Sequence, residues 1–369
     1  MSEQASVCIP VHPGLVLQGL LNGKTTSKRN NQKTANHDTP CLRLDNRTSP
    51  FQFREPKLQV FDLGHVMLTF ENNHEMNTAT ARTPGEIAIT SRKPSSCTKV
   101  FGICRGEITK PAADKPNQGR INFNVEFSGI ADSAFQPLIA NGEHFVQSSS
   151  SSGGQQQQNS PNSVNTVCIT NRIERILKQT NAIDEESLCL VSGEKCWELT
   201  VTVIAINNDG NLVDACVLAG LLALKTFRKE QIQIVEDGSL QVFTKEEREP
   251  IALNIHHLPI PVSFGVVSVG NGLGNGGSGR NSSSRNNKLF LADMNRQEEL
   301  LADGVVTLAV NQFGEICGTE VIGAEIEATE IFDLLLPLAV ERSRALVGFL
   351  DEKVVEFEEH RRKVRMKRD

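Results

Sequence analysis

The stretch that decides the fold is Glu198 to Phe227, which reads ELTVTVIAIN-NDGN-LVDACVLAGLLALKTF. In its first ten residues apolar and polar side chains alternate, and the apolar positions of this pattern are Leu199, Val201, Val203 and Ala205. Successive side chains of a strand point to opposite faces, so an alternation with a period of two is typical of a half-buried strand. The pattern therefore predicts a strand over 198–207.

A helix follows this strand after a tight turn at Asn208-Asp209-Gly210-Asn211. The run from Leu212 to Phe227 is apolar almost throughout and rich in Ala and Leu. A helix that is apolar on all sides is buried in the core of a protein. The stretch thus predicts a central strand, a turn and a buried helix.

Further strands flank this unit on both sides. Candidate strands of one antiparallel sheet are Val66–Phe70, Glu86–Thr90 and Thr98–Ile103, and a second strand series runs through 232–268. Asp303–Cys317 predicts a hairpin, and a helix is expected from Thr329 to about Leu350, kinked or loosened at Pro337. This order of elements predicts an α+β fold made of two similar βα halves.

Composition shifts divide the chain into four parts. We expect an N-terminal arm at 1–40, a first domain at 41–230, a second domain at 231–350 and a charged basic tail at 351–369. Low-complexity stretches at 147–163 and 265–287 predict disordered insertions, because Ser, Gly, Gln and Asn cannot bury a core. The last ten residues hold six Lys or Arg, which favours a flexible interaction segment.

The bulk composition limits the possible functions. The net charge of −6, the absence of Tyr and the single Trp argue against a general nucleic-acid binder, so any RNA contact must come from a local basic patch. The nine cysteines include no Cys-x-x-Cys pair, which predicts reduced thiols and no zinc site. No run approaches the roughly 18 apolar residues of a membrane helix, and the N-terminus is not expected to be a secretory signal.

Arg43-Leu44-Asp45-Asn46-Arg47 opens an ordered series of motifs along the chain. It is similar to the Arg-x-Asp-Gly-Arg motif of the RNase PH family, with Asn46 in place of Gly, and the series resembles the non-catalytic ring subunits of the eukaryotic RNA exosome within that family. Similar segments follow at Thr98–Val100 with Gly102, Ser187–Trp197, Asn208–Ala215, Phe243–Pro250, Ile255–Ile260, Asp303-Gly304 and Glu315–Cys317. The resemblance covers roughly 41–350.

The resemblance implies a two-half RNase PH fold, of the type also seen in domain 2 of ribosomal protein S5. It further implies partners: homologous ring subunits around an RNA channel, S1/KH-type cap proteins, and RNA itself. The implied locations are nucleus, nucleolus and cytoplasm, with no membrane association and no cofactor.

Active members of the family need a phosphate site in the turn after Asp-Gly and two aspartates about six residues apart. Here Leu212 and Val213 stand where a hydroxyl and a guanidinium are required, and apolar side chains cannot supply charged hydrogen bonds. The resemblance places the acidic pair near Ile251 and His257, neither of which is a carboxylate. The sequence therefore predicts a chain that is not an enzyme.

Several polar residues near these positions have a structural and a catalytic interpretation. His256 and His257 have no evident third partner, which favours the structural one. Asp209 and Asp214 are expected to be turn and helix-cap residues. Two alternative functions stay open: an active phosphate-dependent 3′→5′ exoribonuclease, and a free-standing adaptor that uses its basic tail.

The candidate RNA contacts are basic residues. Arg172, Arg175 and Lys178 share one face of a predicted helix, where they form either a solvated face or an RNA contact. Related ring subunits offer arginines there to the active site of a neighbour, and Lys99 and Arg105 are weaker candidates on the strand at 98–103.

Overall fold

The structure is a computed structural model that describes residues 43, 45, 47, 49–71, 97–132, 135, 161–235, 240–245, 247–269, 287–323 and 325–366. Three predicted features lie outside these residues: the N-terminal arm at 1–40, the candidate strand at 86–90 and most of the insertion at 147–163. Within the described residues no helix is long and apolar enough to cross a membrane.

The first sheet is built around the strand predicted at 198–207. Its strands are β1 (Glu55–Asp62), β2 (His65–Glu71), β3 (Cys97–Thr109), β4 (Arg120–Phe127), β5 (Cys189–Val191) and β6 (Lys195–Asn207). They lie in the order β1-β2-β3-β6-β4, with β5 paired to β6, and only β4 and β6 run parallel. The predicted strands at 66–70 and 98–103 are confirmed as β2 and β3.

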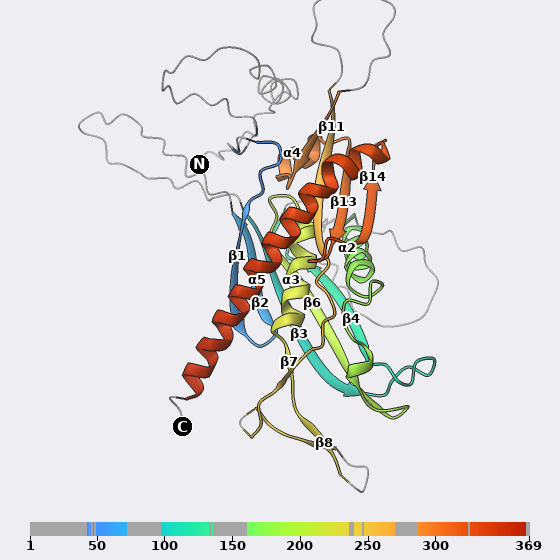
Figure 1. The fold of residues 1–369 in the computed structure, drawn as a ribbon, viewed down its shortest axis with the longest axis vertical. Coiled ribbons are helices and arrows are strands. Elements are labelled where there is room, and N and C mark those ends of the chain that lie inside the picture. The colour runs from blue at the N-terminus through green and yellow to red at the C-terminus, as the bar shows by residue number, and fades with distance from the viewer. Residues whose placement is uncertain are drawn as a thin grey trace, which may run out of the picture.

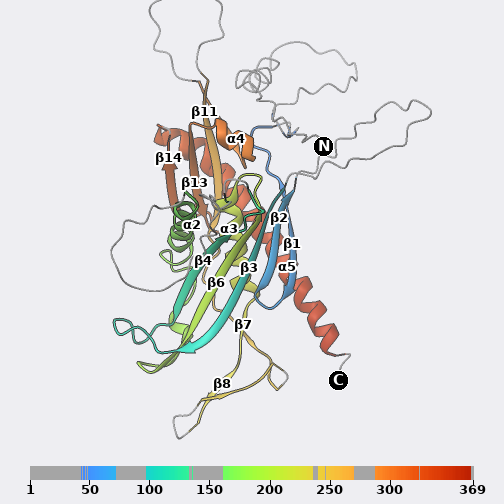
Figure 2. The same ribbon diagram turned by 180° about the vertical axis from the view of Figure 1, so that it is seen from behind.

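The predicted buried helix is α3 (Leu212–Thr226), which packs against β2, β3 and β6. The approach to β3 is close, because a β-carbon at Gly102 would lie 3.1 Å from the carbonyl carbon of Ala219 and still closer to its oxygen. Helix α2 (Pro161–Leu177) packs beside it on β4. The view from behind shows the strands of the first sheet in front of α3 and α5 (Figure 2).

The second half repeats this plan. Its sheet has the order β12 (Asn287–Ala292), β11 (Ile260–Val269), β13 (Gly304–Val310) and β14 (Ile316–Ile322), all antiparallel, and the short helix α4 (Arg296–Leu301) follows β12. The insertion predicted at 265–287 begins too early, because residues 265–269 form the end of β11 and pair with β12. The glycines around these residues suggested a loop, but Val266 and Val267 are buried in the strand.

The C-terminal helix is longer than predicted. A π-helical segment, Glu330–Leu335, leads into α5 (Leu336–Arg365) at Pro337, which agrees with the expected loosening there. The tail predicted at 351–369 is wrong up to residue 365, because the helix continues across the first half of the molecule (Figure 1). Buried Val354 and the ion pairs Lys225–Asp351 and Arg228–Glu358 hold this extension.

A narrow two-stranded extension joins the two halves. It contains β7 (Arg228–Lys229) paired with β10 (Ile251–Ala252), and beyond them β8 (Ile232–Ile234) paired with β9 (Leu240–Val242). It lies at the end of the first sheet away from the second one (Figure 1). One continuous hydrophobic cluster includes α3, α5 and both sheets, so the predicted α+β fold of two βα halves is confirmed.

Candidate functional site

The candidate site surrounds the turn Asn208–Asn211 between β6 and α3. Thr98 on β3 donates its hydroxyl hydrogen to the Gly210 carbonyl oxygen (2.7 Å) and accepts the Asp209 N–H (3.1 Å). The Gly210 N–H donates to the side-chain oxygen of Asn208 (3.1 Å). These contacts hold the turn against the start of β3. Asp209 is a turn residue, as predicted.

The turn is pressed against the segment that joins β12 to α4. Gly210 has φ +81° and Asn211 has φ +55°, so both adopt the left-handed conformation. A β-carbon at Gly210 would overlap the backbone of Asn295 and lie 2.6 Å from the backbone nitrogen of Arg296. Glycine is therefore required here both by conformation and by space.

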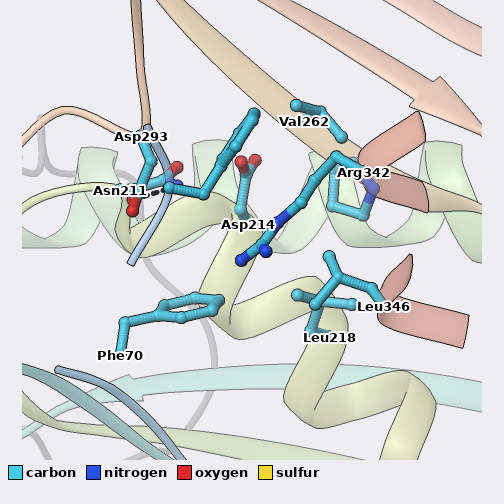
Figure 3. Close-up of a pocket in the computed structure, with 10 residues that line it drawn as sticks. Phe70, Asn211, Asp214, Leu218, Val262, Asp293, Arg342 and Leu346 are labelled. Atoms are coloured by element: carbon cyan, nitrogen blue, oxygen red, sulfur yellow. Dashed lines mark hydrogen bonds between the residues drawn. The ribbon is translucent and has the colours of Figure 1, made fainter. Parts of the chain in front are cut away.

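Asp293, at the end of β12, is fully enclosed by donors. Its carboxylate accepts from Arg54 through the backbone N–H (2.8 Å), Nε (3.0 Å) and Nη2 (2.8 Å). Asn211 Nδ2 donates to the same group (2.8 Å), the contact drawn as a dashed line in Figure 3. Burial alone raises the pKa of Asp293, but the charge and hydrogen bonds of Arg54 hold it well below its usual range. Asp293 is therefore an ionised structural anchor.

Two more arginines come from the predicted Arg43–Arg47 motif. Arg43 donates through Nε to Glu298 (2.9 Å) and through Nη1 to the Ala292 carbonyl oxygen (2.7 Å). Arg47 donates to Asp45 (2.6 Å) and to the Asp293 carbonyl oxygen (2.7 Å). Burial, together with repulsion from Arg43, lowers the pKa of Arg47. The motif thus binds the segment at 292–298 and closes the site from the N-terminal side.

Glu299 supplies a carboxylate at the start of α3. Its Oε1 accepts the backbone N–H of Asn211 (2.7 Å), and Arg296 lies 3.6 Å from its other oxygen. Burial raises the pKa of Glu299, and the Asn211 hydrogen bond and the Arg296 charge offset only part of this effect. A backbone N–H at the N-terminus of α3, a kind of position where anions bind, therefore already donates to a carboxylate of the chain itself.

The predicted position of the acidic pair is wrong. Ile251 lies on β10, paired with Lys229 in the two-stranded extension, and His257 lies in the segment that follows it. The carboxylates beside the turn are Asp293 and Glu299, which are six residues apart. The acidic residues are therefore present, contrary to the sequence prediction. The usable signal was the spacing of two carboxylates directly after an apolar strand at 287–292.

Leu212 and Val213 begin α3 directly after the turn. Leu212 is buried, and Val213 packs against the core. The polar residues at this site that were not predicted from the sequence are Arg54, Asp293, Glu298, Glu299 and Arg342. Within the described residues, no group of His, Cys, Asp and Glu side chains could hold a metal ion.

The sequence predicted that Asp214 caps α3, and this prediction is wrong. The N-cap residue is Asn211, and the buried Asp214 carboxylate accepts the N–H (2.8 Å) and the hydroxyl (2.7 Å) of Ser263 on β11. It therefore joins the central helix to the second sheet. A cavity of about 10 Å³, with room for about one water molecule, lies among Asp214, Asn211 and Arg342 (Figure 3).

Asp214 is expected to make stability depend on pH. Burial raises its pKa from 3.8 to about 6, so the folded chain holds a proton that the unfolded chain has lost. This contribution to stability is present below about pH 4 and is lost as the pH rises through about 6, at most roughly 3 kcal/mol for two pKa units. We expect urea unfolding to show the parent losing stability relative to Asp214→Asn between pH 4 and 6.5. Parallel stability curves would contradict this.

The strongest RNA candidates lie at the junction between the two halves. Arg172 Nε is 3.0 Å and Arg175 Nη1 is 3.9 Å from the carboxylate of Glu320 on β14. The Arg172 side chain is only 22% exposed, whereas Arg175 is 57% exposed. Arg172 is therefore less exposed than a fully solvated helix face would be, and it helps to join α2 to the second sheet. Contact of either with RNA stays a prediction.

The other three candidates lie elsewhere, and each has different neighbours. Lys178 follows the end of α2, and its Nζ donates to the Ile121 carbonyl oxygen (3.4 Å). Lys99 is half-buried on β3 opposite Thr69, and Arg105 is exposed on the same strand opposite Thr200. Their contact with RNA also stays a prediction.

Comparisons with known proteins place the chain in a family. Residues 87–230 match the model "3' exoribonuclease family, domain 1" of RNase PH, and residues 257–336 match domain 2 of the same family. "Exosome complex component RRP45" of Danio rerio is 33% identical over 226 residues, 61% of this chain and 47% of that protein. The human protein of that name is 33% identical over 60% of this chain and 41% of its own length. The chain therefore matches less than half of the length of these relatives.

Solved structures agree at the level of the fold. The "archaeoglobus fulgidus exosome with RNA bound to the active site" contains a chain with a TM-score of 0.56 and 19% identity, covering 91% of this chain and 96% of that one. An "Archaeal exosome core" chain has a TM-score of 0.55. The two family models lie in chain order on the two βα halves, as the motif series predicted. The chain belongs to the RNase PH family of 3′ exoribonucleases.

Proposed function

We propose that this chain is a non-catalytic ring subunit of an RNA exosome, of the RRP45 type. Relatives that carry the name "Exosome complex component RRP45" and the likeness to archaeal exosome chains support this assignment. The partners that we propose are homologous RNase PH-type ring subunits, S1/KH-type cap proteins and RNA. The proposed locations are nucleus, nucleolus and cytoplasm.

The observation that carries the non-catalytic part is the apolar start of α3. Leu212 and Val213 follow the turn directly and offer a phosphate neither a hydroxyl nor a guanidinium. The Asn211 N–H, a donor that a phosphate would need, already donates to the Glu299 carboxylate (2.7 Å). Asp293 is bound by Arg54 and Asn211, so it is held in a structural role. The carboxylates are present but are used to close the site.

We expect the purified chain to release no nucleoside diphosphates from single-stranded RNA in the presence of inorganic phosphate. The reason is that the turn cannot bind the attacking phosphate. The measurement is chromatography of the products over a time course, with an active phosphorolytic RNase PH enzyme as the positive control. Phosphate-dependent shortening that co-elutes with this chain and disappears in the Glu299→Ala variant would support the active-enzyme alternative.

Ring membership is tested separately by co-purification. The tagged full chain should recover a six-subunit ring of RNase PH-type proteins from its own cells. Recovery of the chain without homologous ring subunits would favour the free-standing adaptor instead. This outcome is independent of the phosphorolysis result.

The proposed RNA path predicts a change in salt dependence. Replacing Arg172 and Arg175 by glutamine in the assembled ring should weaken binding of single-stranded RNA, and should do so alike for different sequences, since phosphate contacts do not read bases. Each lost phosphate contact should also reduce the salt slope by roughly 0.7. Binding is measured across a salt series for the variant and the parent ring.

Glu320→Gln provides the opposing control. Glu320 lies 3.0 Å from Arg172, so removing its charge frees both arginines for phosphate. RNA binding should then become tighter if this surface contacts RNA. Unchanged affinity in both variants would mean that the cluster only joins α2 to β14.

A further inference from the structure

Two cysteines face each other at the tip of the β5–β6 hairpin. Cys189 on β5 is the register partner of Cys196 on β6, next to the pair Val191 and Lys195. Directly opposed residues of antiparallel strands place their β-carbons about 4.5–5.5 Å apart on one face. A disulfide needs β-carbons about 3.5–4.5 Å apart, so a small movement of the irregular strand β5 brings the two sulfurs together.

The two thiols differ in their access to solvent. Cys189 is half-buried, and its Sγ–H donates weakly to the Pro116 carbonyl oxygen (3.8 Å). Cys196 is fully buried and is paired on its other side with Thr109 of β3. Among the described residues the buried Thr109 hydroxyl has no hydrogen-bond partner. A hydroxyl group thus lies on the strand next to Cys196, at the opposed register position.

The inner cysteines of the core behave differently. Burial raises the pKa of Cys104 far above its usual range and that of Cys216 to about 12, so both stay protonated thiols. Reactivity requires the thiolate and access to the oxidant. The half-exposed Cys189 with an opposed partner is therefore a better site of oxidation than these two residues.

We propose that Cys189 and Cys196 form a reversible disulfide when the chain meets a peroxide. The Cys189 thiol loses its proton and attacks one peroxide oxygen, the O–O bond breaks, and Cys189 becomes a sulfenic acid while the departing hydroxide takes up the proton as water. The Cys196 thiol then loses its proton and attacks the Cys189 sulfur. The S–S bond forms, the S–O bond breaks, and the sulfenic hydroxyl leaves with that proton as a second water. Two thiols and one hydrogen peroxide thus give one disulfide and two waters.

The bond closes only the short loop at 190–195, so it contributes little to global stability and stays open to exchange with other thiols. Its effect is local. Cys189 gives up its hydrogen bond to Pro116, and the Gly193 N–H (2.9 Å) is left as a donor to that carbonyl oxygen. Oxidation therefore loosens the contact between this hairpin and the loop at 110–119.

The test uses the reduced full chain treated with hydrogen peroxide, alkylated and digested with trypsin without reductant. Lys195 lies between the two cysteines, so trypsin separates them unless a disulfide joins the two peptides. We expect the linked pair, lighter by two hydrogens than the sum of the free peptides. Fragmentation assigns the bond to Cys196 rather than Cys216, and reductant should reverse it.

Single cysteine variants test which thiol is oxidised first and which one forms the disulfide with it. In Cys196→Ser the link should disappear and a sulfenic acid at Cys189 should become trappable by a dimedone probe. In Cys189→Ser neither the link nor a sulfenic acid at Cys196 should form, and Cys168→Ser should behave like the parent. Oxidation of Cys189 in the parent to a sulfinic acid without any link would overturn the proposal, as would a link to Cys216.

Discussion

Replacing Arg54 by methionine is expected to lower the free energy of unfolding by roughly 3–5 kcal/mol. Arg54 is fully buried, and its guanidinium bonds Asp293 together with the carbonyl oxygens of Asp209 (3.0 Å) and Gly210 (3.1 Å). Methionine fills similar space but leaves the Asp293 carboxylate without its main counter-charge. Chemical unfolding of the full chain, followed by circular dichroism, measures the difference.

A matched control separates burial from charge. Arg175→Met removes a cation that is 57% exposed, for which the expected loss is below about 1 kcal/mol. Adding Asp293→Asn to Arg54→Met should restore part of the stability, since the unpaired negative charge is then gone. Equal losses in the Arg54 and Arg175 variants would show that the buried pair contributes nothing special.

Gly210→Ala is expected to disrupt the turn itself, with a loss of stability of roughly 2–4 kcal/mol from the left-handed conformation and steric overlap together. A left-handed conformation costs a non-glycine residue on the order of 1 kcal/mol. The larger part comes from overlap, because the new β-carbon lies 2.6 Å from the Arg296 nitrogen and closer still to Asn295. Neither neighbour is a flexible side chain, so β12 and α4 must move. Thermal unfolding with Gly193→Ala as the comparison measures this.

Gly193 is a close control, because it has a similar φ of +76° but nothing within 4 Å of a β-carbon. Its alanine variant should therefore show the conformational cost alone. If both variants lose the same stability, the contact between the turn and α4 is softer than the structure indicates.

Local patterns were sufficient to predict much of the fold. The alternation in β6 and the all-apolar run of α3 depend only on neighbours in the chain. The helix was placed within one residue of its observed ends, whereas the strand begins at Lys195, three residues before its predicted start. The end of α5 was missed because the charged sequence after Leu350 resembles a solvated tail. Its ion pairs with Lys225 and Arg228 are contacts between distant segments, which periodicity cannot reveal.

The site was predicted less completely for the same physical reason. The Arg43–Arg47 motif and the turn were identified, but the partners that connect them, Asp293 and Glu299, were not. The acidic pair was expected near Ile251 and His257, but Ile251 lies in the two-stranded extension, away from the turn. Likewise, spacing put Arg172 and Arg175 on one helix face, but only the fold brings Glu320 to them.

The arginine cluster also has a consequence for how the protein is made. Arg54 and its partner Asp293 are separated by 239 positions, and Arg43 and Glu298 by 255. During synthesis the first half emerges long before these two carboxylates exist, so Arg43 and Arg54 lack the partners Glu298 and Asp293 until the second half follows. The turn ahead of α3 is completed only when β12 and α4 have left the ribosome. Contacts this distant in sequence slow folding, and the nascent first half must stay soluble in the meantime.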